Sequence, residues 1–256
     1  MCKAGTVDRD FRKGYLEIDF VNEPFNSPVQ LVVRTLRLFG ARFGMIAAIT
    51  LLVFVPGNLL VQMICEALDI PVKGIWSYLL MNAAAIVMGS VVVPAMVYGL
   101  VAWLRSGKAA GIGACLRWGR RQWSKTLWNE VKVNITVILW GALLVVPGII
   151  AMIRLIFTDV VVAIEGDTTP DPMERSQQLS KGRKWRMFAV LAPIELVNLA
   201  AMFVILDRPG IAESRAVFAI ASAVLSIFEQ LTPVAALLMY LGLAPLRQKA
   251  TAKRAA

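Results

Sequence analysis

The chain of 256 residues is 58% hydrophobic and only 17% charged, and its mean hydropathy is +0.66. Soluble domains are about 45–50% apolar and about 25% charged, so this composition indicates an integral membrane protein. The sequence has no histidine, and Cys2, Cys65 and Cys115 lie far apart. Histidine-dependent catalysis and Cys/His metal sites are therefore excluded, and we expect no enzyme activity, catalytic residue, metal or cofactor.

The net charge of +10 comes from 27 lysines and arginines against 17 acidic residues. The excess gathers in segments that flank the apolar runs, where anionic lipid head groups lie. A nucleic-acid-binding module would need a basic region free of membrane-spanning sequence, and the chain has none. We therefore expect membrane lipids as partners, together with other membrane protein subunits, and no nucleic acid.

Residues 1–42 are predicted to form a polar cytoplasmic N-terminal extension with an interfacial segment. They lack the apolar core and cleavage site of a signal peptide. Within them Leu16, Ile18 and Phe20 alternate with acidic residues, which predicts one short strand. The strand lies on its own protein or pairs with a partner chain, and the sequence leaves both alternatives open.

The apolar runs that follow predict an all-α, polytopic transmembrane helical bundle over residues 43–244, ahead of a basic cytoplasmic tail at 245–256. Two Pro-Gly pairs, Pro56-Gly57 and Pro147-Gly148, lie inside these runs. Proline removes a helical hydrogen-bond donor and glycine accepts sharp turns, so we expect a helix break at each pair. The apolar runs are 43–65, 76–104, 133–164, 187–206 and 216–244.

The third run is too long for one crossing, because a straight helix over 133–164 would rise about 48 Å against a hydrocarbon core of ~30 Å. If it crosses once, the cytoplasmic side holds 16 lysines and arginines and the outside holds 10. If it enters and returns, the numbers become 23 and 3. The positive-inside rule favours the return. We therefore predict a hairpin or re-entrant pair turning at Pro147-Gly148, about six membrane segments, and both termini on the cytoplasmic side of a bacterial inner membrane.

Five polar residues interrupt the later runs and should lie near the bilayer centre. Charges at that depth are costly, so they pair with one another or line a wet cavity. We expect Arg154 to pair with Glu195, with Asp159 as the competing partner. A structural cluster and a transport pathway remain alternative interpretations. The predicted intramembrane polar cluster comprises Arg154, Asp159, Glu195, Asn198 and Glu229.

The connector at 165–186 carries the start signals of a short helix. Asp171 is a good N-cap, Pro172 suits the first helical position, and Glu174 has the spacing of a capping box. Basic and aromatic residues in and near this connector, and in the earlier segment 105–132, have the composition of a membrane interface. The residues expected to contact anionic lipid or a partner are Arg117, Arg120, Arg121, Lys181, Arg183, Lys184, Trp185 and Arg186.

The segment 145–188 contains VVPGII, an acidic exit at Glu165-Gly166-Asp167, and then RSxxLxKGxxW at 175–185. Over residues 115–200 this resembles the UPF0259 (YciC-like) bacterial inner-membrane proteins and the membrane domain attached to some glycerophosphodiester phosphodiesterases. The resemblance implies six membrane spans and no particular activity. Together these features favour a non-enzymatic membrane scaffold, accessory subunit or lipid-organising protein. The alternative is a small transporter or permease that uses the midplane charges.

Overall fold

The computed structural model describes residues 27–71, 74–206 and 214–255, and over these ranges the chain is helical with no strand. The all-α prediction is confirmed, whereas the strand expected at Leu16–Phe20 lies outside the described residues. The elements are α2 (Pro28–Ala41), α3 (Phe43–Ala67), α4 (Ile75–Ser106), α5 (Ile112–Leu143), α6 (Val145–Leu155), α7 (Thr158–Glu165), η3 (Gly166–Thr168), α8 (Pro172–Ser180), α9 (Lys184–Leu206), α10 (Arg215–Glu229) and α11 (Leu231–Ala255).

Within the described residues, five helical stretches are long and apolar enough to cross a bilayer, which confirms a multi-pass membrane protein. Many of their large apolar side chains face outward, as lipid contact requires. α5 is not among the five; most of the seven lysines and arginines of 105–132 fall on its first half. The five stretches are Phe43–Ala67, Ile75–Ser106, Val145–Glu165, Lys184–Val204 and Arg215–Leu243.

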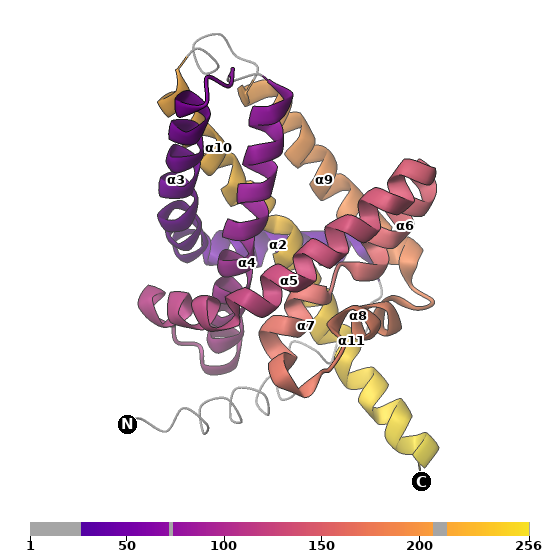
Figure 1. Ribbon diagram of the computed structural model, residues 1–256. Helices are drawn as coiled ribbons and strands as arrows, with labels where there is room; N and C mark the ends of the chain where they lie inside the picture. The colour runs from indigo at the N-terminus through magenta and orange to yellow at the C-terminus, as the bar shows by residue number, and fades with distance from the viewer. Residues whose placement is uncertain (1–26, 72–73, 207–213, 256) are drawn as a thin grey trace.

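The helices α3, α4 and α10 pack side by side, with α9 against α10 (Figure 1). Figure 1 also shows α2 running across this group, and α7, α8 and α11 gathered at the end of the bundle where α4 finishes. α2 is amphipathic: it buries Leu38 and Phe39 and exposes Val29 and Leu36. The predicted interfacial segment of the 1–42 extension is thus an ordered helix. The last apolar stretch ends at Leu243, beside the predicted limit at residue 244, and the segment that follows continues α11 as helix to Ala255.

The predicted break at Pro56-Gly57 is wrong, since α3 passes through both residues as one helix. A proline inside a helix loses one hydrogen bond, and the packing of a membrane bundle compensates for that loss. Gly57 serves packing instead of turning: a Cβ added there would overlap Met88 Sδ on α4. Asn58, next along α3, donates through Nδ2 to the Ala219 carbonyl of α10 at 3.3 Å. Gly57 and Asn58 therefore lie where α3 closely approaches α4 and α10.

The chain does turn back within 133–164, but it turns at Leu144 and not at Pro147-Gly148. Leu144 is extended, with φ −160° and ψ 141°, and joins α5 directly to α6. Pro147 falls in the first turn of α6, where its missing amide would have had no helical acceptor anyway. Gly148 lies where the two arms meet, and a Cβ there would be 2.8 Å from Gly141 Cα. We call residues 133–154, which form this tight pair of arms, the α5–α6 hairpin.

Candidate lipid head-group site

One face of α5 presents two lysines, Lys125 and Lys132. Lys125, Trp128, Asn129 and Lys132 follow one another at the three- and four-residue spacing that aligns side chains along a helix. Asn129 Nδ2 donates to the Lys125 carbonyl at 2.8 Å. Lys132 Nζ lies 5.3 Å from the centroid of the Trp128 ring, within the range of a cation–π contact. The face is therefore cationic and flanked by an aromatic ring.

The facing wall is the turn from α7 into α8. Gly166 has φ 51° and ψ −119°, a conformation that favours glycine, and it turns the chain out of α7. Asp171 Oδ1 accepts from the amides of Met173 at 3.0 Å and Glu174 at 3.2 Å, which confirms the predicted N-cap of α8. The Glu174 carboxylate accepts instead from Gln178 at 3.1 Å, so the capping box is not completed.

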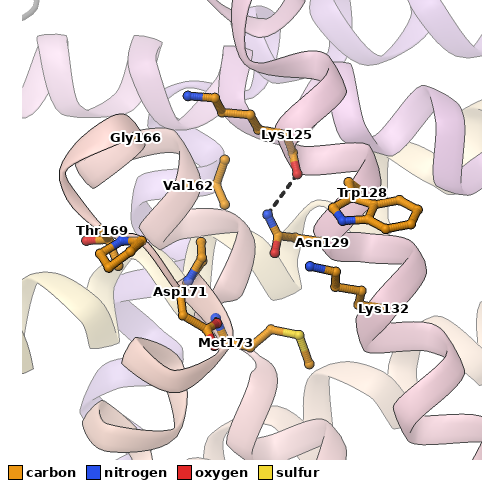
Figure 2. Close-up of a pocket in the computed structure, with 11 residues that line it drawn as sticks. Lys125, Trp128, Asn129, Lys132, Val162, Gly166, Thr169, Asp171 and Met173 are labelled. Atoms are coloured by element: carbon orange, nitrogen blue, oxygen red, sulfur yellow. Dashed lines mark hydrogen bonds between the residues drawn. The ribbon is translucent and has the colours of Figure 1, made fainter.

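Between the two walls lies a cavity of about 610 Å³. Figure 2 shows Lys125, Asn129 and Lys132 extending from α5 toward the Gly166–Met173 wall. Two lysines and the carboxylate of Asp171 are the charged residues among those that line it. Such a cavity suits an anionic group such as a phosphate, with the Asn129 amide available for hydrogen bonding. The lining residues are Lys125, Trp128, Asn129, Lys132, Val162, Gly166, Thr169, Pro170, Asp171, Pro172 and Met173.

A partly buried hydrogen-bond centre at Glu165 holds the second wall in place. Its Oε1 accepts from Arg175 Nε at 3.1 Å and from the Tyr240 hydroxyl at 2.7 Å, and its Oε2 accepts from the Thr169 hydroxyl. The Glu165 side chain is only 11% exposed, and Tyr240 is fully buried. One carboxylate therefore ties together α7, α8, α11 and the cavity wall.

Ser176, which follows Arg175 in the RSxxLxKG motif, holds α8 against the junction between α6 and α7. The Ser176 hydroxyl donates to the Arg154 carbonyl at 2.8 Å and accepts from the Phe157 amide at 3.1 Å. Leu179 is buried, and Gly182 has φ +81°, which favours glycine at the end of α8. Ser176 and Leu179 of the motif therefore have a structural role: they hold α8 against the junction between α6 and α7.

The lysines of the cavity were not among the residues predicted to contact lipid. None of the eight predicted residues lines the cavity. Arg117, Arg120 and Arg121 are exposed elsewhere on α5; Lys181, Trp185 and Arg186 are exposed beyond α8; Arg183 and Lys184 are half-buried. The aligned spacing of Lys125, Asn129 and Lys132 was the available signal. Which face of α5 meets the 166–173 turn, however, depends on tertiary packing.

The predicted polar cluster is divided among separate places. Arg154 Nη2 donates to Gln177 Oε1 at 2.9 Å, and Glu195 Oε1 accepts from the Thr232 hydroxyl at 2.6 Å. The expected Arg154–Glu195 ion pair is therefore wrong. Glu229 lies near enough to Glu195 for their charges to interact. Arg154 does not reach Glu195 because α8 folds back against the end of α6 and supplies Arg154 with a neutral partner, Gln177.

The remaining members of that cluster have no partner of the predicted kind. Among the described residues, Asn198 Oδ1 and Asp159 Oδ1 are buried without a hydrogen-bond partner. Asp159 interacts electrostatically with Glu130 of α5, and one oxygen of the Glu130 carboxyl is likewise buried without a partner. Burial, reinforced by the Asp159 carboxyl, raises the pKa of Glu130. The protonated form of the Glu130 carboxyl is therefore favoured.

No protein-family model, no curated protein and no solved structure matches this chain. The resemblance carried by residues 145–188 therefore stays a prediction. The fold itself defines the class: this is an all-α, multi-pass membrane protein. Its candidate site is a lysine-lined cavity between α5 and the α7–α8 turn.

Proposed function

We propose that this protein is a non-enzymatic integral membrane protein that binds an anionic phospholipid in the α5 cavity. In that role it organises lipid around a membrane complex as a scaffold or accessory subunit. The observation that carries the proposal is the pair of lysines, Lys125 and Lys132, on one wall of a cavity of about 610 Å³. Pockets for small ligands have volumes of about 300–1,000 Å³, so a phospholipid head group fits.

The surroundings of the cavity favour a lipid over a soluble anion. Directly beyond Lys132, α5 exposes Ile135, Ile138 and Leu139, each at least half-exposed. A ligand with a phosphate in the cavity would therefore have its acyl chains beside an apolar helix face. Cationic side chains attract anionic lipids by about 1 kcal/mol each near a membrane surface.

The test removes both charges of the cavity. Lys125→Gln together with Lys132→Gln should weaken binding of phosphatidylglycerol to the detergent-solubilised protein by about 30-fold. The reason is that two lost contacts of about 1 kcal/mol each amount to about 2 kcal/mol. Native mass spectrometry of the protein titrated with phosphatidylglycerol gives the dissociation constant directly.

The matched control is Arg117→Gln with Arg120→Gln, which removes the same charge from the same helix. Both arginines are exposed and lie outside the cavity. We expect this control to change the affinity less than threefold. Equal losses in the two double variants would mean that α5 attracts lipid by charge alone, and the proposed site would be rejected.

We also propose the orientation: a bacterial inner membrane, with both termini and the cavity on the cytoplasmic side. The charge distribution supports this, because the return at Leu144 leaves 23 lysines and arginines inside and 3 outside. In a Cys-free background on spheroplasts, an impermeant maleimide should label Leu68→Cys and spare Gln178→Cys until the cells are opened. Both side chains are exposed. Labelling of Gln178→Cys from outside would contradict the orientation.

Transport is the less supported alternative. It depended on one cluster of midplane charges, and the described residues place Arg154, Asp159 and Glu195 in separate surroundings. A pathway for ions or substrates would need these groups to line a common wet cavity.

A further inference from the structure

The α5–α6 hairpin exposes a continuous apolar surface at its tip. Leu143 is 71% exposed and Val145 is 72% exposed. Along both arms, every exposed large side chain between Lys132 and Arg154 is apolar, including a tryptophan. These residues are Ile135, Ile138, Leu139, Trp140, Leu143, Leu144, Val145, Val146, Ile149, Ile150 and Met152. In water such a surface would be strongly unfavourable, so it requires an apolar environment.

The two arms form one unit and do not separate into independent spans. A single extended residue, Leu144, joins them, and Gly141 approaches Gly148 at the closest crossing. Small residues at such a crossing allow the helix backbones to approach in lipid. The arms therefore enter the membrane to the same depth.

Charged residues mark the same level at the base of both arms. Lys132 is the last charged residue before the tip on α5, and Arg154 is the first after it on α6. Arg154 is held there by Gln177 of α8, which belongs to the polar connector. Residues 133–143 rise about 16 Å at 1.5 Å per residue, whereas the hydrocarbon core is about 30 Å thick. The hairpin thus reaches the bilayer midplane at most.

The position of the hairpin in the bundle agrees with this limit. Figure 1 shows it inclined to α3, α4 and α10, and α6 packs against α9. Inclination reduces the depth that the arms reach. α9 also exposes apolar side chains, such as Leu196 and Val197. The apolar surface of the hairpin is therefore continuous with the apolar surface of α9.

α2 lies at the same end of the bundle as the base of the hairpin. Arg42, which follows α2, lies with its guanidinium 4.2 Å from the Trp103 ring, near the end of α4. α5 begins a few residues later in the chain, and Trp118 of α5 stacks on Tyr98 of α4 at 5.2 Å. α2 and the start of α5 therefore lie at the same side of the membrane as the base of the hairpin.

We propose that the α5–α6 hairpin enters a single leaflet from the side of Lys132 and Arg154, and that acyl chains of that leaflet cover its exposed face. Each helix is about 10–12 Å across, so the hairpin expands one leaflet without a counterpart in the other. The charges at the base would meet the head groups, and the apolar tip would end near the midplane. This inference does not depend on the head-group cavity.

Site-directed spin labelling tests the depth. Single cysteines replace Ile135, Leu139, Leu143, Val146 and Ile150, with the native cysteines changed to alanine and the protein in vesicles of phosphatidylcholine and phosphatidylglycerol. Power saturation with oxygen and a nickel chelate measures the depth of each nitroxide. The expected profile rises from Ile135 to Leu143 and falls from Val146 to Ile150. Leu196→Cys, near the middle of α9, is the reference for the midplane.

Two outcomes would overturn the proposal. A profile that peaks within each arm and returns to a shallow value at Leu143 would show that the hairpin crosses both leaflets. Labels at the tip that are shielded from oxygen, or broadened by a label on another copy, would show that a protein covers this face instead of lipid. The spin-label profile is measured without reference to lipid affinity, so failure of the head-group site leaves it unaffected.

Discussion

Glu165→Ala is expected to lower the free energy of unfolding by about 3 kcal/mol, the lower end of the range for removing one partner of a buried ion pair, because this ion pair is only partly buried. The change leaves Arg175 without its carboxylate and the buried Tyr240 hydroxyl without this acceptor. It also releases Thr169, and with it the wall of the cavity. The measurement is thermal unfolding in detergent, followed by circular dichroism, which should show a lower Tm.

Two further variants separate the contributions to this loss. Glu165→Gln keeps an acceptor for Tyr240 but removes the charge, so it should be less destabilising than alanine. Glu174→Ala is the matched control, because this glutamate is exposed on α8 and its carboxylate accepts a hydrogen bond from Gln178. Its cost should stay within about 0.5 kcal/mol. Equal melting temperatures for Glu165→Ala and Glu174→Ala would contradict the role of Glu165 as a structural centre.

The fold class could be predicted because long apolar runs in the sequence identify membrane segments directly. The run 76–104 became α4 at Ile75–Ser106, an error of one or two residues at each end. The return in the third run followed from length and charge, which are local properties of the sequence. Both predictions rest on how the segments distribute between lipid and water, and neither requires knowing which helices pack together.

The positions of the breaks could not be predicted by the same means. A proline can interrupt a helix, begin one, or lie inside it, and the context of Pro56 and Pro147 differs only in the fold. The pairing of Arg154 failed for a related reason. Helical rise gives depth along one segment, but it does not reveal that α8 turns back and places Gln177 beside Arg154.

The candidate site needed both kinds of information. Asp171 was recognised as a helix cap from its neighbours alone, and the cap forms as expected. Lys125 and Lys132 gained their importance only when α5 met the α7–α8 turn across the cavity. Local signals therefore predicted one wall of the site, and the contact between distant segments supplied the other.

The crossing of α4 and α5 fixes that cavity in space and leads to the second prediction. Gly119 of α5 is buried against α4, where an added Cβ would overlap the Val91 carbonyl oxygen and lie 2.9 Å from Ala95 Cβ. Backbone cannot move aside as a flexible side chain can. Gly119→Ala should therefore destabilise the protein by about 3 kcal/mol, the upper part of the usual range for overpacking.

Gly113→Ala provides the control on the same helix, because a Cβ at Gly113 meets no atom within 4 Å. Alanine is favoured over glycine in a helix by up to about 1 kcal/mol, so this variant should be neutral or slightly more stable. The two substitutions have the same chemistry and opposite expected signs. Thermal unfolding in detergent measures both, and a Gly119→Ala protein as stable as Gly113→Ala would mean that α5 does not cross α4 at Val91. In that case the lysine face of α5 would also lose its position opposite the α7–α8 turn, and the proposed head-group cavity would have to be abandoned.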